Sequence, residues 1–277
     1  MPVHDLQHRL NPQFPEVSAD GIWEEREYLY ANALPKAAAV LVDSEAGKED
    51  VLDCYPVAGE KIRVLPFTPP AYLRRDYTEE ELGAIRRKYH LPEGFLFYPS
   101  LFWSHKNHEI ILQALSHIKV NQGVAIPAVF TGATQGRYSR YPRLLEMTRA
   151  SGLEDLVRFT GYVPDDEMGG LYRLATALVM PTFFGPTNIP YLEAFALGCP
   201  VIGSDIRGVR EQIGGAGLLV NPSSIQEVAE AILKIWSDEA LRQELIKKGY
   251  DKIKAWDFSK FSAALNQLLD SLGKTRT

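Results

Sequence analysis

Short apolar runs recur along the chain from residue 95 onward, and segments with apolar residues at helical spacing separate them. Strands of a parallel sheet are covered on both faces, so they form continuous runs of Val, Ile, Leu and Phe rather than an alternating pattern. The runs predict strands over residues 95–98, 128–131, 157–160, 177–180, 201–203 and 217–220.

The segments between these strands predict helices over residues 107–119, 140–151, 165–174, 191–197 and 209–213. Alternation of strand and helix indicates right-handed crossovers and a parallel sheet with helices on both faces. Ligands bind such sheets outside the carboxyl ends of the strands. Three loops follow strands directly, so we expect them to share one rim: residues 100–106, 132–136 and 183–189.

The chain before residue 75 has a different pattern. Strands are predicted over residues 37–43 and 62–65, with a helix over residues 44–55 for which Ser44 is a natural N-cap. Two strands and one crossover helix do not bury a sheet by themselves. The first residues read as the end of a strand. We therefore interpret this region as the remnant of a domain whose opening strands are missing.

Amphipathic helices are predicted over residues 225–237, 238–255 and 258–272, and the charges of residues 77–88 indicate a solvated helix face. The predicted fold class is α/β. It comprises one complete Rossmann-like parallel-sheet domain and a partial N-terminal Rossmann-like domain, joined by a hinge at Thr-Pro-Pro-Ala. The expected divisions are residues 1–75, residues 76–255 and a C-terminal helix over residues 256–277.

Composition narrows the class of protein. Hydrophobic residues make up 45% of the chain and charged residues 23%, as in ordinary soluble domains. A net charge of −5 argues against nonspecific nucleic-acid binding. No apolar run has membrane-spanning length and no leading signal pattern is present, so we expect a cytoplasmic protein; peripheral association with the inner face of the membrane stays open. Cys54 and Cys199 are too few for a disulfide framework and are expected to be reduced.

The most informative segment spans residues 181–205. Pro190 is suited to the first turn of a helix, so the N–H groups of Thr187, Asn188 and Ile189 are predicted to be unpaired and to form an anion site. Glu193 follows in the first turn, where its carboxylate suits sugar hydroxyls. A second interpretation stays open, because a Glu near a helix start also offsets the helix dipole and such loops commonly join strand to helix.

Five segments together resemble a known family: "FYPSLFWSHKNHEIILQAL", "GYVPDDEMGGLYRLATALVMPT", "IPYLEAFALGCPVIGSD", "GVREQIGGAGLLVNP" and "VDSEAGKEDVL". The chain resembles the retaining glycosyltransferases of family 4, which have the GT-B fold, from His4 to the last helix. The resemblance implies transfer of a sugar from a UDP- or GDP-linked donor to the hydroxyl of a saccharide or lipid-linked acceptor. It implies no cofactor and no catalytic metal.

The same resemblance assigns donor-binding residues. Family members hold the donor with two Glu residues separated by seven others; the second, which binds ribose hydroxyls, matches Glu193. The first, which contacts the donor sugar, falls on Gly185 here. This departure leaves backbone N–H groups, including that of Ile189, and the side chain of Thr187 or Asn188 to replace the missing carboxylate.

The phosphate loop also departs from the family. The usual Gly-Arg pair falls on Ser100 and Leu101, whereas the following Lys is retained as Lys106. A Lys ammonium is a point charge that can stabilise a departing diphosphate. With the Arg absent, Lys106 and the helix start are expected to carry more of the phosphate binding. A solvated lysine without a ligand role is the alternative.

Four further positions match functional family positions. His4 matches a histidine that the first domain presents to the transferred sugar, and Tyr162 with Val163 matches the loop that meets the base. Glu211 matches a structural carboxylate, for which capping or an ion pair is the favoured role.

Other functions fit parts of the sequence pattern. A nucleotide-sugar-binding fragment or module without independent transfer activity is the main alternative, because the opening strands of the first domain are missing and Gly185 lacks the carboxylate. A nicotinamide-dependent dehydrogenase would share the sheet, but the glycine-rich first turn and the ribose acid are missing. The groups of His4, Asp5 and His8 and of His105 and His108 complete no recognised metal-ligand set.

Overall fold

The computed structural model describes residues 1–274 and contains two parallel sheets of unequal size. The larger sheet has six strands in the order β5-β4-β3-β6-β7-β8, with every neighbouring pair parallel. Its strands are β3 (Leu96–Pro99), β4 (Ala128–Thr131), β5 (Val157–Gly161), β6 (Ala177–Met180), β7 (Val201–Ser204) and β8 (Leu218–Val220).

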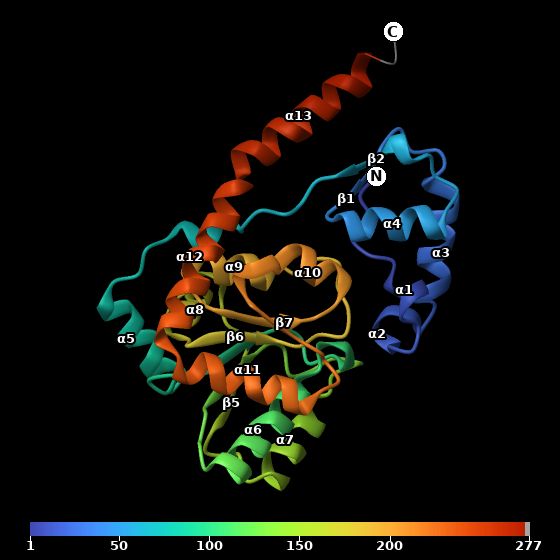
Figure 1. Cartoon of the computed structure of the whole chain (residues 1–277). Coiled ribbons are helices and arrows are strands. Elements are labelled where there is room, and N and C mark those ends of the chain that lie inside the picture. The colour runs from blue at the N-terminus through green and yellow to red at the C-terminus, as the bar shows by residue number, and fades with distance from the viewer. Residues whose placement is uncertain (275–277) are drawn as a thin grey trace.

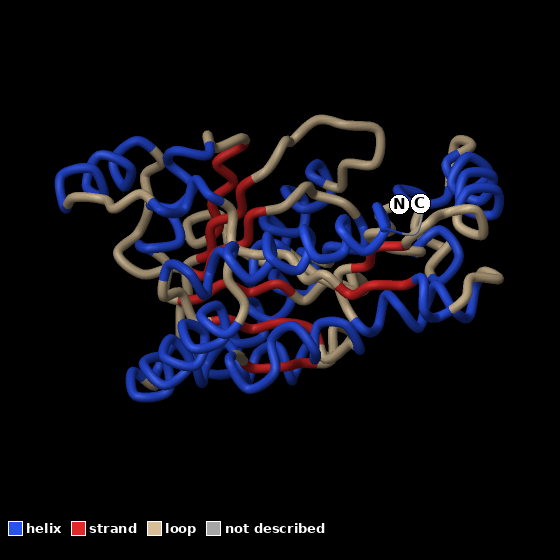
Figure 2. The backbone as a smooth tube through the Cα atoms, turned by 90° about the horizontal axis from the view of Figure 1, so that it is seen from above, coloured by secondary structure: helices blue, strands red, loops and turns tan. Residues whose placement is uncertain are grey.

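Helices cover both faces of this sheet, as Figures 1 and 2 show. On one face lie α6, α7 and α11, and on the other lie α8, α9 and α10, with α12 packed against α9. Their bounds are α6 (His108–Gln122), α7 (Tyr141–Ala150), α8 (Asp165–Leu174), α9 (Ile189–Leu197), α10 (Arg207–Ile213), α11 (Ile225–Ser237) and α12 (Glu239–Ala255). The predicted doubly covered parallel sheet is confirmed.

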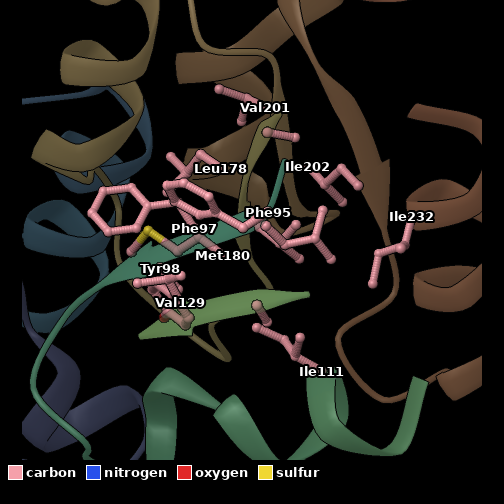
Figure 3. Packing of buried hydrophobic residues seen from close by; sticks show 14 of the residues in the cluster. Phe95, Phe97, Tyr98, Ile111, Val129, Leu178, Met180, Val201, Ile202 and Ile232 are labelled. Atoms are coloured by element: carbon pink, nitrogen blue, oxygen red, sulfur yellow. The ribbon is translucent and has the colours of Figure 1, made fainter. Parts of the chain in front are cut away.

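The core of the large sheet is continuous from strand to helix (Figure 3). Phe95, Phe97 and Tyr98 are fully buried beside Ile111 of α6 and Ile232 of α11. The interpretation of these aromatic residues as core, rather than as a stacking platform, is confirmed. Burial of side chains on both faces explains why the strands have no polar alternation.

The smaller sheet consists of β1 (Val40–Val42) and β2 (Ile62–Val64), paired in parallel. Pro2 forms a further parallel bridge to Leu41, so the first residues do extend this sheet. The connecting helix α4 (Glu45–Cys54) has its predicted N-cap, because the Ser44 hydroxyl accepts a hydrogen bond from the Gly47 N–H at 3.0 Å. A short η1 helix (Gly59–Lys61) precedes β2.

Three helices between residues 7 and 33 were not predicted: α1 (Gln7–Leu10), α2 (Pro15–Ser18) and α3 (Ile22–Ala33). The first two span only one turn each, and α3 has no buried residue, so none carries an apolar stripe. In contrast, all eight predicted strands are present. The largest shift of a strand boundary is at β1, which begins at Val40 rather than at residue 37.

Residues 65–70 link the two parts and lead into η2 (Ala71–Arg74) and α5 (Glu79–Lys88). Figure 1 shows that α13 (Phe258–Lys274) runs from α12 away from the large sheet and past the N-terminal part. Residues 275–277 of the predicted C-terminal helix lie outside the described residues. No helix within residues 1–274 is long and apolar enough to cross a bilayer.

Candidate functional site

The strand order of the large sheet reverses between β3 and β6, and open parallel sheets bind ligands in the crevice at such a reversal. The loop after β3 ends in η3 (Ser104–Lys106), and the loop after β6 spans residues 181–188. The two loops are joined directly, because the His105 carbonyl accepts hydrogen bonds from the Phe183 N–H at 2.8 Å and the Thr182 hydroxyl at 3.0 Å.

The loop after β4 reaches the same rim. A Cβ placed on Gly132 would lie 2.1 Å from the Ser100 carbonyl oxygen, so the two backbones are in close contact. All three predicted loops therefore meet at the carboxyl edge of the sheet, as the parallel topology requires.

Lys106 ends η3, in the loop after β3 at the reversal of strand order. Lys106 is partly buried, and its ammonium makes no hydrogen bond or ion pair with a residue of the described chain. Burial lowers the pKa of Lys106 to about 8, and the carboxylates of Asp5 and Glu16 offset part of that effect. A desolvated ammonium without a direct partner is suited to binding an anion.

The backbone that carries Lys106 is held firmly. The Tyr98 hydroxyl donates to the Lys106 carbonyl at 2.9 Å. Asn107 adopts a left-handed conformation with φ of 59°, and its amide nitrogen donates to the carbonyls of Pro181 at 2.9 Å and Pro222 at 2.7 Å. These bonds fix the loop after β3 against the loops after β6 and β8.

The start of α9 lies beside this loop, with Pro190 in its first turn. The Asn188 N–H is not free, which corrects the sequence prediction: it donates to Gln212 Oε1 at 2.8 Å, and Gln212 Nε2 donates back to the Asn188 carbonyl at 2.9 Å. A side chain from α10 thus caps this position. Within residues 1–274, the N–H groups of Thr187 and Ile189 make no hydrogen bond.

Gly185, where the family's first Glu is missing, has a backbone that disfavours any other residue. Its φ is +136°, and a Cβ there would lie 2.9 Å from the amide nitrogen of Asn188. That nitrogen is buried and has no hydrogen-bond partner among the described residues. The Asn188 amide therefore occupies the space in which a Glu side chain would begin.

Glu193 is buried, with only 6% of its surface exposed. The Tyr72 hydroxyl donates to Oε1 and the Tyr172 hydroxyl to Oε2. Burial raises the pKa of Glu193, and the two tyrosine hydrogen bonds oppose that rise. The sequence predicted a carboxylate open to sugar hydroxyls; in the structure both of its oxygens already have a donor. Tyr72 belongs to η2, so Glu193 also ties the linker to α9.

Asp43 and His4 face this site from the N-terminal part. The Thr187 hydroxyl donates to Asp43 Oδ2 at 2.8 Å across the boundary between the two parts. Burial raises the pKa of Asp43, and the Thr187 hydrogen bond and the charge of His4 lower it in part. The exposed His4 ring stacks on Phe67 at 5.6 Å. His4 thus lies at the boundary between the two parts, near the Asp43 carboxylate that Thr187 contacts.

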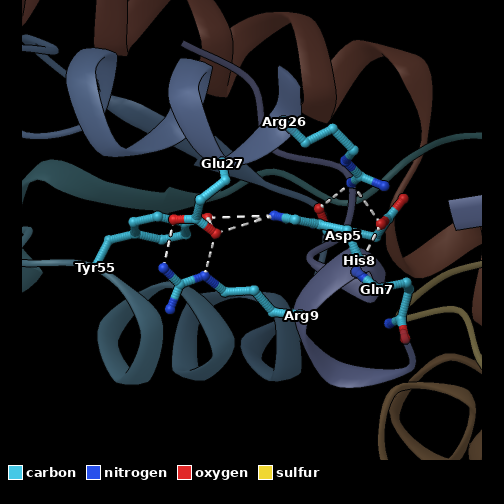
Figure 4. A network of polar contacts seen from close by, with 7 residues as sticks. All are labelled: Asp5, Gln7, His8, Arg9, Arg26, Glu27 and Tyr55. Carbon is cyan, nitrogen blue, oxygen red and sulfur yellow. Dashed lines mark hydrogen bonds and ion pairs between the residues drawn. The ribbon is translucent and has the colours of Figure 1, made fainter. Parts of the chain in front are cut away.

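A polar network fixes the segment that carries His4 and Asp5 (Figure 4). Asp5 Oδ1 accepts hydrogen bonds from the Gln7 N–H at 2.9 Å and from Arg26 at 2.6 Å. His8 is fully buried, and burial lowers its pKa to about 4. Within residues 1–274, no cluster of three or more His, Cys, Asp or Glu side chains is placed to hold a metal ion.

The remaining predicted residues lie around the rim. Tyr162 is 73% exposed and Val163 is buried just before α8. The nearby Asp165 carboxylate contributes to the raised pKa of Glu193, so this loop lies on the Glu193 side. Glu211 has the predicted capping role, because its carboxylate accepts hydrogen bonds from the Glu45 N–H at 2.9 Å and the Ala46 N–H at 3.2 Å at the start of α4.

Sequence reasoning missed Glu16, Asp43, Tyr72 and Gln212. Only Asp43 carried a usable signal, since it directly follows a predicted strand and so belongs at a carboxyl edge. A cavity of about 300 Å³ opens between the two parts, and Asp43, Phe67, Thr187, Lys252 and Trp256 contribute to its walls.

Proteins of similar sequence include two named mannosyltransferases. The chain is 27% identical over 252 residues to the serotype-specific mannosyltransferase WbdA of Escherichia coli, covering 87% of this chain and 29% of WbdA. It is 24% identical to O-antigen chain mannosyltransferase B of Escherichia coli, covering 82% of this chain and 58% of that protein. The chain thus spans less than two thirds of the length of these relatives.

Solved structures share the fold. Sucrose-phosphate synthase of Thermosynechococcus elongatus superposes with a TM-score of 0.82 at 22% identity, over 99% of this chain and 67% of that one. HepE of Anabaena, solved in complex with UDP-glucose, has a TM-score of 0.82 at 18% identity, over 98% of this chain and 71% of that one. The profile of the family Glycosyl transferases group 1 matches residues 80–252, which include Lys106, Gly185 and Glu193. The chain belongs to the glycosyl transferases of group 1.

Proposed function

We propose that this chain transfers a sugar from a UDP- or GDP-linked donor to a hydroxyl of a saccharide or lipid-linked acceptor, with retention at the anomeric carbon. The observation that carries the proposal is that the loop carrying Lys106 is bonded to the loop that leads into α9, at the reversal of strand order. A partly buried ammonium without a partner, on the same rim as backbone N–H groups without acceptors, is an environment that favours a pyrophosphate.

Lys106 and the N–H groups of Thr187 and Ile189 would bind the diphosphate in this proposal. Departure of the nucleoside diphosphate is the difficult step, because negative charge accumulates on the leaving oxygen as the anomeric carbon becomes oxocarbenium-like. Groups that are already in place for that charge stabilise the transition state more than solvent does. Loss of charge at Lys106 would therefore slow departure as well as weaken binding.

The Asn188 amide is proposed to take part of the role of the missing first Glu. Its amide nitrogen is buried beside Gly185 and lacks an acceptor, so a donor-sugar hydroxyl could accept from it. Thr187 is less suited to this role, since its hydroxyl already donates to Asp43.

Glu193 is proposed to hold the ribose. Each carboxylate oxygen has two lone pairs, so Tyr72 and Tyr172 occupy only part of its accepting capacity. The two tyrosines orient the carboxylate, which then needs no reorganisation when a ribose hydroxyl donates to it. Tyr162 and Val163 would face the base, and His4 would contact the transferred sugar from the N-terminal part.

No protein side chain is nominated as the general base. In the proposed reaction the anomeric C–O bond to the diphosphate breaks and the acceptor oxygen bonds to the same face of that carbon. The acceptor proton passes to the departing phosphate oxygen. The names of the relatives support a sugar as the transferred group, and the UDP-glucose complex of HepE supports a nucleotide-linked donor.

A nucleotide-sugar-binding module without transfer activity is the second candidate. Gly185 favours it, because the carboxylate that family members present to the donor sugar is absent, and the positive φ of Gly185 and the Asn188 side chain both disfavour one. Both candidates require the same diphosphate site, so they differ in turnover rather than in nucleotide binding.

Isothermal titration of the full chain with UDP, GDP and their sugar conjugates tests both candidates. Lys106→Ala is expected to weaken binding about 10- to 100-fold through loss of a charge-assisted contact. Lys119→Ala, which removes an exposed lysine at the far end of α6, is the matched control and should bind like the wild type.

A transfer assay, with the anomeric configuration of the product read by NMR, separates the two candidates. Transfer with retention supports the enzyme, and binding without transfer supports the module. Equal binding by the Lys106→Ala and Lys119→Ala variants would remove the proposed diphosphate site.

A further inference from the structure

Glu16 of α2 reaches out of the N-terminal part and into the domain that carries Lys106. Its Oε1 accepts a hydrogen bond from the His105 backbone N–H at 2.9 Å and lies 2.7 Å from His105 Nδ1. The Glu16 side chain is fully buried and that of His105 is 5% exposed. Burial of an unpaired carboxylate costs free energy of folding. The Glu16–His105 contact is therefore more than incidental packing.

Aromatic rings enclose this pair. The His105 ring stacks on Phe184 at 4.0 Å with the planes 14° apart. Phe14, the N-cap residue of α2, stacks on Phe183 at 5.7 Å and meets the edge of Phe184 at 5.4 Å. These rings exclude water from the Glu16–His105 contact, and they come from both parts of the chain.

His105 is anchored on every side, and Lys106 is the next residue. Its carbonyl is bound by the loop after β6, its N–H and ring by Glu16, and its ring face by Phe184. If Glu16 were absent, the N–H and Nδ1 of His105 would both lose their acceptor in a buried environment. The turn of η3 would then be free to shift, and Lys106 with it.

The charge of Glu16 also acts on Lys106. Burial lowers the pKa of His105, so its ring is neutral near pH 7 and Nδ1–H donates to Glu16. Those donated bonds lower the pKa of Glu16 despite its burial, so Glu16 is a carboxylate. Its Oε2 has no hydrogen-bond partner within the described chain. The charged groups that act on Lys106 are the carboxylates of Asp5 and Glu16. The charge of Lys106 in turn helps to lower the pKa of His105 and of His108.

We propose that Glu16 is a positioning residue for the diphosphate site: acting through His105, it fixes Lys106 and keeps a compensating negative charge beside it. The inference rests on the proposed function. It adds that the site is complete only while α2 is docked in the aromatic pocket of Phe183 and Phe184. A segment of the N-terminal part thereby completes a site whose other residues belong to the larger domain.

Titration of the full chain with UDP and with GDP tests this role in Glu16→Ala and Glu16→Gln. The matched control is Asp20→Asn, because Asp20 also links the N-terminal part to the larger domain, through Arg137 and Tyr138, at an exposed position. Glu16→Ala should weaken binding at least about 10-fold and Asp20→Asn less than about 2-fold. Thermal melts of each variant show whether the fold is retained.

The same titrations repeated over a range of pH give the midpoint at which nucleotide binding declines. A purely structural role of Glu16 would leave this midpoint unchanged. Nucleotide binding should decline as Lys106 loses its proton. Glu16→Gln keeps an acceptor oxygen for His105 but removes the charge that raises the pKa of Lys106. The midpoint of the decline should therefore fall by about half a pH unit or more relative to the wild type.

The outcomes are distinct. Glu16→Ala binding like Asp20→Asn, or a Glu16→Gln midpoint equal to that of the wild type, overturns the positioning role while leaving the diphosphate site in place. If Glu16→Ala does not fold, the Glu16→Gln midpoint decides alone. A wild-type chain that binds neither UDP nor GDP overturns the proposed function and this inference with it.

Discussion

Replacement of Lys106 by methionine should stabilise the protein while it weakens diphosphate binding about 10- to 100-fold. The pKa of Lys106 falls from its ordinary value of 10.5 to about 8, because folding removes the ammonium from water without giving it a direct partner. A fall of 2.5 units corresponds to an unfavourable contribution of about 3 kcal/mol in the charged state. Methionine fills a similar volume with no charge. We therefore expect a gain of about 1–3 kcal/mol in the free energy of unfolding at pH 7.

The stability gained by Lys106→Met should decrease as pH rises. Below pH 8 the lysine is charged in both the folded and the unfolded chain, so the wild type carries the whole penalty. Between pH 8 and 10.5 the folded chain loses the proton first, and the penalty shrinks as pH rises. The advantage of the Met variant should thus be largest at pH 7 and small by pH 10.

Urea unfolding at pH 7 and at pH 10 measures this advantage, with Lys247→Met as the control for removal of an exposed lysine. The control should change stability by less than about 0.5 kcal/mol at either pH. The reasoning would be refuted if the Met variant were less stable than the wild type at pH 7. It would also be refuted if the stability difference between variant and wild type were the same at pH 7 and at pH 10. Either result would mean that Lys106 is solvated or has a partner.

Two further predictions concern the donor loop and its acid. Tyr172→Phe removes the donor to Oε2 of the buried Glu193 and should cost about 1–3 kcal/mol in urea unfolding; adding Glu193→Gln should recover part of the loss, and full additivity of the two changes would contradict the contact. Gly185→Glu, which restores the family's carboxylate, should destabilise the fold by about 1–3 kcal/mol because of the positive φ and the Asn188 amide. Asn188→Ala in that background should recover stability in a thermal melt, and a Gly185→Glu variant as stable as the wild type would show that the loop accommodates the side chain.

The position of Asn188 shows how far a local rule extends. Pro190 and the loop before it predicted a helix start with unpaired N–H groups, and α9 does begin there. The prediction failed at one N–H group, because Gln212 of α10 caps it. A cap supplied by a residue 24 positions away leaves no mark in the local sequence.

Glu193 shows the same limit for a carboxylate. Its place in the first turn of α9 follows from sequence, but its burial does not. Tyr72 reaches it from a linker 121 positions earlier, and Tyr172 from α8. Whether an acid is solvated or enclosed depends on which distant side chains the fold brings to it.

The sequence by itself determined the parallel sheet, the alternation of strands and helices along the chain, and the rim that the loop carrying Lys106 shares with residues 183–189. It could do so because burial on both faces forces continuous apolar strands, and because crossover connections are right-handed. Only the tertiary structure decided that Lys106 lacks a partner, that Asn188 fills the space beside Gly185, and that Glu16 docks onto His105. Desolvation and paired hydrogen bonds depend on groups that are distant in sequence and adjacent in space, so no local pattern records them.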